Sequence, residues 1–177
     1  RRLELLKWAD GSERRYIVED DYDSEFRYKG KPIPALQGYD SHGKVIYIGT
    51  FSKSIAPAIR VSYLVLPEKL LRLYEERGTA FSSTVSRVDQ RIVAGFLKEG
   101  YYERHLNKMR AVYKSRHDVL LDGLKEIPDI EVSGENAGVH LLVRFRNGKT
   151  EAEACAQAKQ AGIHVYGLSD YYVREKE

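Results

Sequence analysis

The sequence predicts an α/β fold, in which buried strands and amphipathic helices share one core. Apolar runs of strand length occur at 15–19, 45–49 and 61–66, and such near-continuous runs fit strands that are covered on both faces. Helical periodicity is clearest at 101–127, where apolar residues recur every three, four or seven positions. A hydrophobic share of 42% is sufficient for a packed core.

Local signals place the elements in order along the chain. Gly100 ends one helix, and Thr150 with Glu153 three residues later forms a capping-box pattern at the start of another. Glycine and proline between 29 and 43 indicate a loop. We expect a helix tail at 2–8, strands at 15–19, 45–49 and 61–66, helices at 67–77, 85–98 and 101–127, strands at 130–132 and 139–145, a helix at 150–161, and a last strand at 164–166.

A change in composition near Tyr101 predicts two units. Residues 1–100 carry the buried strands, which we expect to be parallel, and residues 101–177 carry the long helix and a smaller α/β unit. The chain begins with Arg1 and ends in a charged run, so we interpret both ends as cuts through a longer protein.

Composition argues against several functional classes. The net charge of +3 gives no argument for nucleic-acid binding by this segment. A single cysteine, Cys155, excludes a disulfide framework and a cysteine-rich zinc site, and the five histidines lack metal-ligand spacing, so we expect no metal. Acidic residues interrupt the basic face of the 101–127 helix, which favours a solvated face or a subunit contact over DNA binding. Without a transmembrane run or a signal peptide, we expect a cytoplasmic protein.

Polar residues with matching chemistry gather at the ends of the first three strands. Ligands of open α/β sheets bind outside the carboxyl ends of strands, so these residues form a candidate site. Each residue alone is a weak signal, because an isolated lysine, arginine or acidic cluster is usually solvated surface. The set is Asp20, Tyr22, Thr50, Ser52, Lys53 and Arg60.

This set suits pyridoxal 5'-phosphate (PLP). PLP requires an amine for a Schiff base, a carboxylate against its pyridine nitrogen, and a cation with small donors around its phosphate. A phenol that donates to the ring hydroxyl is a further benefit. Asp20, Tyr22, Lys53 and Arg60 supply these groups, in that order along the chain, with the hydroxyls of Thr50 and Ser52 beside Lys53.

Two segments carry a family resemblance. YIVEDDYDSEFRYKGKPIPALQ (16–37) and VIYIGTFSKSIAPAIRVSYLVLP (45–67) resemble the MocR-type transcriptional regulators of the GntR group. The likeness is looser but continuous as far as NAGVHLLVRF (136–145). It implies a fold-type-I, aminotransferase-like α/β domain, with the C-terminal half of its large domain at 1–100, and a linking helix with an incomplete small domain at 101–177.

The resemblance also implies a role for each site residue. Asp20 would pair with the pyridine nitrogen, Tyr22 would reach the ring hydroxyl, and Lys53 would form the internal aldimine. Arg60, with Thr50 or Ser52, would bind the phosphate. Such relatives carry an upstream winged helix-turn-helix and the first half of the large domain, neither of which is in this sequence, and we expect a homodimer.

The resemblance therefore favours an effector sensor with no catalytic residue. An amine effector would displace Lys53 from the cofactor and form an external aldimine, and the attached DNA-binding unit would change its contact with DNA. A PLP-dependent aminotransferase is the alternative, and a scaffold that binds no cofactor is disfavoured because Asp20, Tyr22, Lys53 and Arg60 are all intact.

Three later residues are candidates for effector contact. His140 follows Asn136-Ala137-Gly138, in a strand that the resemblance brings toward the ligand, although a core or edge histidine is the alternative reading. At the position where relatives clamp a carboxylate with arginine, this sequence has Asp170, with Arg174 four residues later. Because an aspartate repels a carboxylate, we expect Asp170 to face a cationic or amide group, or else to be a surface turn residue.

Overall fold

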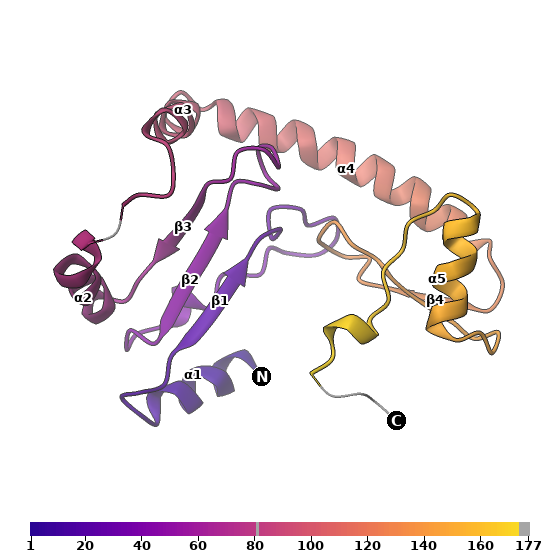
Figure 1. Ribbon diagram of the computed structural model, residues 1–177, viewed down its shortest axis with the longest axis horizontal. Helices are drawn as coiled ribbons and strands as arrows, with labels where there is room; N and C mark the ends of the chain where they lie inside the picture. Colours follow the sequence, from indigo (N-terminus) through magenta and orange to yellow (C-terminus); the bar gives the residue numbers. More distant parts are fainter. Residues whose placement is uncertain (81, 174–177) are drawn as a thin grey trace.

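The computed structural model describes residues 1–80 and 82–173, and these form two lobes bridged by one long helix (Figure 1). The first lobe holds a three-stranded sheet and the second a two-stranded sheet with its own helix. The elements are α1 (Arg2–Asp10), β1 (Ile17–Asp21), η1 (Gln37–Tyr39), β2 (Val45–Thr50), β3 (Ser62–Val65), α2 (Glu68–Arg77), η2 (Gly78–Ala80), α3 (Arg87–Lys98), α4 (Tyr101–Lys125), β4 (Ile130–Ser133), β5 (Leu142–Phe145), α5 (Glu151–Gln160) and η3 (Ser169–Tyr171). The α/β prediction is confirmed.

The three-stranded sheet has the order β1-β2-β3, with β1 parallel to β2 and β3 antiparallel to β2. The prediction that all three strands are parallel was therefore wrong. Only eleven residues separate β2 from β3, and a parallel return needs a crossover of a dozen or more. A backbone hydrogen bond of 3.0 Å from Phe51 N to Val61 O closes this connection and sends the chain back alongside β2.

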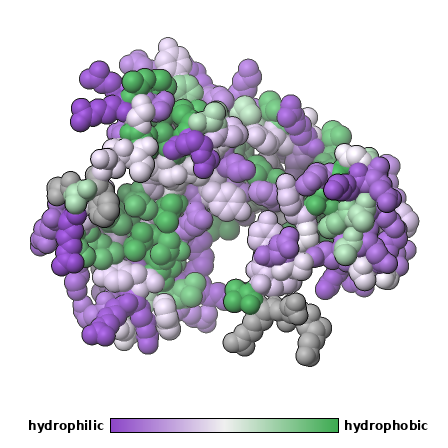
Figure 2. Space-filling view, viewed as in Figure 1, coloured by the Kyte–Doolittle hydropathy of each residue, from purple (hydrophilic) through white to green (hydrophobic). Residues whose placement is uncertain are grey.

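Each strand of this sheet was also expected to be buried on both faces, and this was wrong. One face packs on α1, where Leu6, Leu36 and Val45 are buried and Ile17 packs against them. On the other face Val18 is 59% exposed and Leu64 is 56% exposed. Hydrophobic side chains gather over β2 and β3 in Figure 2. The three apolar runs do form strands, but the described helices cover only one face of the sheet that they make.

Gly49 provides a test of packing at the end of β2. A Cβ added there would lie 2.2 Å from Cζ of Tyr63, whose ring lies across the glycine. We expect Gly49→Ala to lower the free energy of unfolding by about 1–3 kcal/mol, because the ring must move away from its packed position. Denaturant unfolding of the full protein measures this, with Gly38→Ala as the control, since a Cβ at Gly38 meets no atom within 4 Å. Equal effects of the two substitutions would contradict the packing argument.

The second lobe is smaller and follows α4. β4 and β5 pair antiparallel, and Thr150 and Glu153 form the predicted capping box at the start of α5. The strand expected at 139–145 begins only at Leu142, because the preceding turn bonds to another loop instead. The strand expected at 164–166 is wrong: those residues are exposed and pair with no strand among the described residues.

The boundary between Gly100 and Tyr101 falls where α3 gives way to α4. Gly100 has a φ of 70°, a left-handed conformation that glycine adopts without strain. It lets the chain change direction between the two helices. The division into units at 1–100 and 101–177 stays a prediction.

Candidate functional site

The residues predicted to bind a cofactor are placed at one edge of the three-stranded sheet. β1 and β2 are parallel, so Asp20, the next-to-last residue of β1, and Lys53, three residues beyond β2, belong to the same edge. Tyr22 follows directly after β1. Because β3 is antiparallel, its first residue is at this edge as well, and Arg60 precedes it by two residues. A parallel β3 would have placed Arg60 at the opposite edge, so the corrected topology is what unites the set.

Hydrogen bonds organise the turn between β2 and β3. The Thr50 hydroxyl donates to Val61 O at 3.3 Å and accepts from Ser52 N at 3.2 Å. Arg60 donates through Nη1 to Ser52 Oγ, also at 3.3 Å. Two small hydroxyls and one guanidinium are thereby joined beside Lys53, which is the donor chemistry that a phosphate group needs.

The acidic run at the end of β1 contains both hydrogen-bonded and free carboxylates. Glu19 accepts backbone N–H bonds at 2.6 and 2.9 Å from the turn that begins η1, and Asp21 accepts the Tyr47 hydroxyl at 2.8 Å. Burial, with the Asp21 contact, raises the pKa of Tyr47, so its phenol keeps the proton that it donates. Asp20 accepts no hydrogen bond and forms no ion pair with any described residue. Strand alternation places it on the opposite face from Glu19 and Asp21.

The free groups fit PLP. Lys53 is exposed and likewise forms no hydrogen bond or ion pair among residues 1–80 and 82–173, and Arg60 bonds only to a neutral hydroxyl. Asp20 of β1 lies beside Ile48 of β2 in the sheet. Ile48 and Thr50 are two residues apart in β2, so their side chains are on the same face. Asp20 and the Thr50 hydroxyl are therefore on one side of the sheet. An amine, an unpaired carboxylate and an unneutralised guanidinium are therefore available for the groups that PLP presents.

The second lobe reaches this edge through His140. The rings of Tyr22 and His140 are 6.5 Å apart between centroids and meet edge to face at 70°. The neighbouring Asp23 carboxylate, with smaller contributions from burial, Asp20 and Tyr171, raises the pKa of Tyr22. The Tyr22 phenol therefore remains a hydrogen-bond donor at neutral pH.

Of the other two effector candidates, the structure describes Asp170 alone. Asp170 lies exposed in η3, a turn held by Glu151, whose carboxylate accepts the backbone N–H groups of Leu168 and Ser169. The adjoining Tyr171 is 75% exposed. Arg174 lies outside the described residues.

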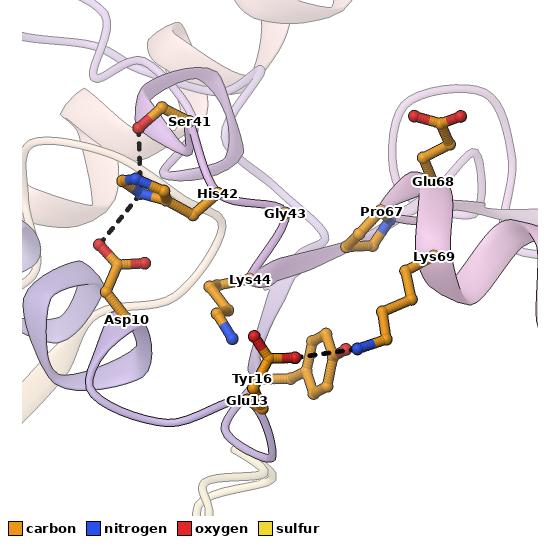
Figure 3. Close-up of a pocket in the computed structure, with 10 residues that line it drawn as sticks. All are labelled: Asp10, Glu13, Tyr16, Ser41, His42, Gly43, Lys44, Pro67, Glu68 and Lys69. Atoms are coloured by element: carbon orange, nitrogen blue, oxygen red, sulfur yellow. Dashed lines mark hydrogen bonds and ion pairs between the residues drawn. The ribbon is translucent and has the colours of Figure 1, made fainter.

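A separate hollow of about 640 Å³ lies at the opposite edge of the sheet, around Lys44 and Pro67 (Figure 3). Its charged groups are already engaged with the protein. Glu13 and Lys69 pair at 2.9 Å across it, and the buried Lys44 donates to a backbone carbonyl at 2.9 Å. It contains none of the predicted site residues.

Among the described residues, no group of three or more histidine, cysteine, aspartate or glutamate side chains could hold a metal ion. No helix within the described residues is both long and apolar enough to span a bilayer.

Comparison with known proteins places the chain in a family. The family model described as "Aminotransferase class I and II" matches residues 6–176. The chain belongs to the aminotransferase class I and II family. The fold-type-I prediction is confirmed by solved aminotransferases. One is the kynurenine aminotransferase of Pyrococcus horikoshii, described as a complex with PMP, at 29% identity and a TM-score of 0.83 over 97% of this chain and 43% of that one.

Several sequence relatives are transcriptional regulators, and one is "Aromatic-amino-acid aminotransferase 1" of Thermococcus litoralis, at 34% identity over 73% of this chain and 31% of the relative. The chain is 41% identical to "Uncharacterized HTH-type transcriptional regulator YhdI" of Bacillus subtilis, over 99% of this chain and 38% of the relative. It is 34% identical to "Probable rhizopine catabolism regulatory protein MocR" of Rhizobium meliloti, over 95% of this chain and 34% of the relative. The resemblance to MocR-type regulators is thus confirmed, and the chain spans between a third and two fifths of the length of these two relatives.

Sequence reasoning missed one residue that the structure places at the site. Asp23 was not among the predicted residues, yet its carboxylate accepts the backbone N–H of Val139 at 3.3 Å from the other lobe. The turn glycine at position 138 was a signal that some group approaches the backbone closely there. Which group approaches it depends on contacts more than a hundred residues apart, and no local pattern contains that information.

Proposed function

We propose that this chain is the effector-sensing, PLP-binding part of a bacterial transcriptional regulator, acting in the cytoplasm as a homodimer. The observation that carries the proposal is a set of three charged groups at one sheet edge that form no ion pair with any described residue: Asp20, Lys53 and Arg60. DNA binding would belong to an N-terminal domain outside this sequence, as the name of the HTH-type relative of Bacillus subtilis suggests. When bound, PLP would supply an electrophilic carbonyl for an amine and an electron sink in its ring.

The chain's own residues would then act as follows. Lys53 would supply the amine that holds the cofactor and would give way to an effector amine. Asp20 would hold the proton of the ring nitrogen, Tyr22 would donate to the ring hydroxyl, and Arg60 with Ser52 would bind the phosphate. Because the 22–29 loop bonds to the second lobe, an effector that favours one lobe arrangement would pass that preference to the attached DNA-binding unit.

Aminotransferase activity is the second candidate, since the solved structures of the same fold are enzymes. The resemblance implies an arginine at the position of Asp170, and the aspartate there favours sensing, because an enzyme acting on amino acids needs a cation for the substrate carboxylate. Amines added to the full protein loaded with PLP separate the two candidates. A spectral shift without turnover, together with a change in operator affinity of at least about fivefold, supports the sensor. Accumulation of the amino form of the cofactor with release of a keto product supports the enzyme.

Asp170 gives a specific prediction about effector charge. We expect the wild type to respond to 1,5-diaminopentane at a lower concentration than to 5-aminopentanoate, whose far end carries a carboxylate. In Asp170→Arg we expect the reverse: 5-aminopentanoate should act at a concentration roughly 3- to 10-fold lower than 1,5-diaminopentane, a difference that an exposed charge pair can produce. Titrations of cofactor absorbance in the full protein measure both values, with Asp122→Arg, on α4, as the control. An unchanged preference in Asp170→Arg would show that Asp170 is a surface turn residue.

A further inference from the structure

The loop at 22–29 joins the two lobes just beyond the cofactor edge. Gly138 N donates to Phe26 O at 2.7 Å, and Asn136 O accepts the backbone N–H groups of Tyr28 at 2.9 Å and Lys29 at 3.2 Å. These bonds dock the turn at 134–140 onto the loop. The same loop begins with Tyr22, so the cofactor edge and the second lobe meet within a few residues of one another.

Asp23 lies at the centre of this junction. Its Oδ2 accepts Val139 N at 3.3 Å. Gly138 has a φ of +84°, and a Cβ added there would lie 2.8 Å from the same oxygen. The carboxylate thus covers Gly138 closely and fixes the backbone of the turn one residue before His140.

The position of His140 follows from this contact. Its ring meets Tyr22 edge to face, at a geometry in which aromatic pairs attract each other. The two rings come from separate lobes, Tyr22 from the end of β1 and His140 from the turn before β5. Tyr22 and His140 are each exposed, which leaves their ring surfaces available to a ligand.

We propose that Asp23 is a positioning residue that holds His140 against Tyr22, and that this aromatic edge selects effector amines carrying a planar aromatic group. The inference rests on the proposed function and specifies its ligand class. Aromatic contacts of this kind correspond to an affinity roughly 2- to 10-fold higher for an amine with an aromatic ring than for one without. Lys53 contributes the amine exchange itself and is separate from this selection.

Two simple amines test the proposal in the full protein loaded with PLP. Benzylamine and methylamine both carry a primary amine, and only the first carries a ring. We expect half-saturation of the absorbance change at a several-fold lower concentration of benzylamine in the wild type. Asp23→Ala should remove that preference and bring the benzylamine value to within about twofold of the methylamine value, since methylamine has no ring to make the contact.

Hydrogen exchange of the Val139 amide gives a readout that needs no cofactor. Asp23→Ala should accelerate this exchange about tenfold or more, because the amide loses its acceptor. Asp23→Asn retains a side-chain oxygen as acceptor and should preserve both the protection and the preference for benzylamine. It also serves as the second variant if Asp23→Ala fails to fold.

The outcomes separate this inference from the proposed function. A wild type whose cofactor absorbance ignores both amines contradicts the proposed function, and the inference falls with it. A wild type that responds equally to both amines contradicts only the aromatic selection. Loss of the preference in Asp23→Asn, with Val139 still protected, overturns the positioning role, because the charge and not the hydrogen bond would then be responsible.

Discussion

Lys53→Ala is expected to abolish the visible absorbance that PLP acquires when a lysine amine bonds to it. Lys53 is exposed, forms no hydrogen bond or ion pair among the described residues, and stands beside the hydroxyls and the guanidinium that suit a phosphate. Its removal therefore takes away the reacting amine without breaking a packed contact. The free energy of unfolding should change by less than about 0.5 kcal/mol, as for surface substitutions generally.

The matched control is Lys69→Ala. Lys69 is also exposed, but it pairs with Glu13 at 2.9 Å at the opposite edge of the sheet. We expect it to leave the absorbance and the amine response unchanged. Visible spectra of the full protein with added PLP provide the measurement. Absorbance that survives in Lys53→Ala would assign the cofactor bond to another lysine and would contradict the role given to this one.

The sequence predicted a set of candidate residues but not the geometry that brings them to one edge of the sheet. Asp20 and Lys53 were predicted because each stands at the end of an apolar run of strand length. The two runs form β1 and β2, which pair in parallel, as a shared site at their carboxyl ends requires. The direction of β3 could not be read from Val61–Leu66, because an apolar run of six residues fits a parallel or an antiparallel neighbour equally well. The short, hydrogen-bonded connection after β2 decided it, and with it the position of Arg60.

The acidic run shows what alternation alone can resolve. A period of two separates Asp20 from Glu19 and Asp21, so a stricter reading of β1 would have predicted which carboxylate is free. The burial of the strands could not be predicted in the same way, because residues such as Val18 are apolar whether or not a helix covers them. The failed strand at 164–166 has a similar cause, since a strand exists only where a partner accepts its backbone hydrogen bonds.

The largest expected loss of stability comes from Phe26→Ala. Phe26 is completely buried, and its ring packs on Tyr113 of α4 with centroids 4.8 Å apart. Removing a buried phenylalanine side chain leaves a cavity and forfeits its transfer free energy, a cost of about 3–5 kcal/mol. Denaturant unfolding of the full protein measures this value. Phe145→Ala is the control, because Phe145 is 43% exposed and should cost much less.

Phe26 also tests how the lobes are connected. Its ring anchors the loop on α4 while its carbonyl accepts Gly138 N, and Arg110 Nε donates to the adjoining Glu25 O at 2.8 Å. If the ring is what keeps the loop in place, Phe26→Ala should expose the amides of Gly138 and Val139 to exchange even under conditions where α4 remains folded. A loss of stability below about 1 kcal/mol, or protection at Gly138 that matches the wild type, would instead mean that the backbone bonds and Arg110 maintain the junction without the ring.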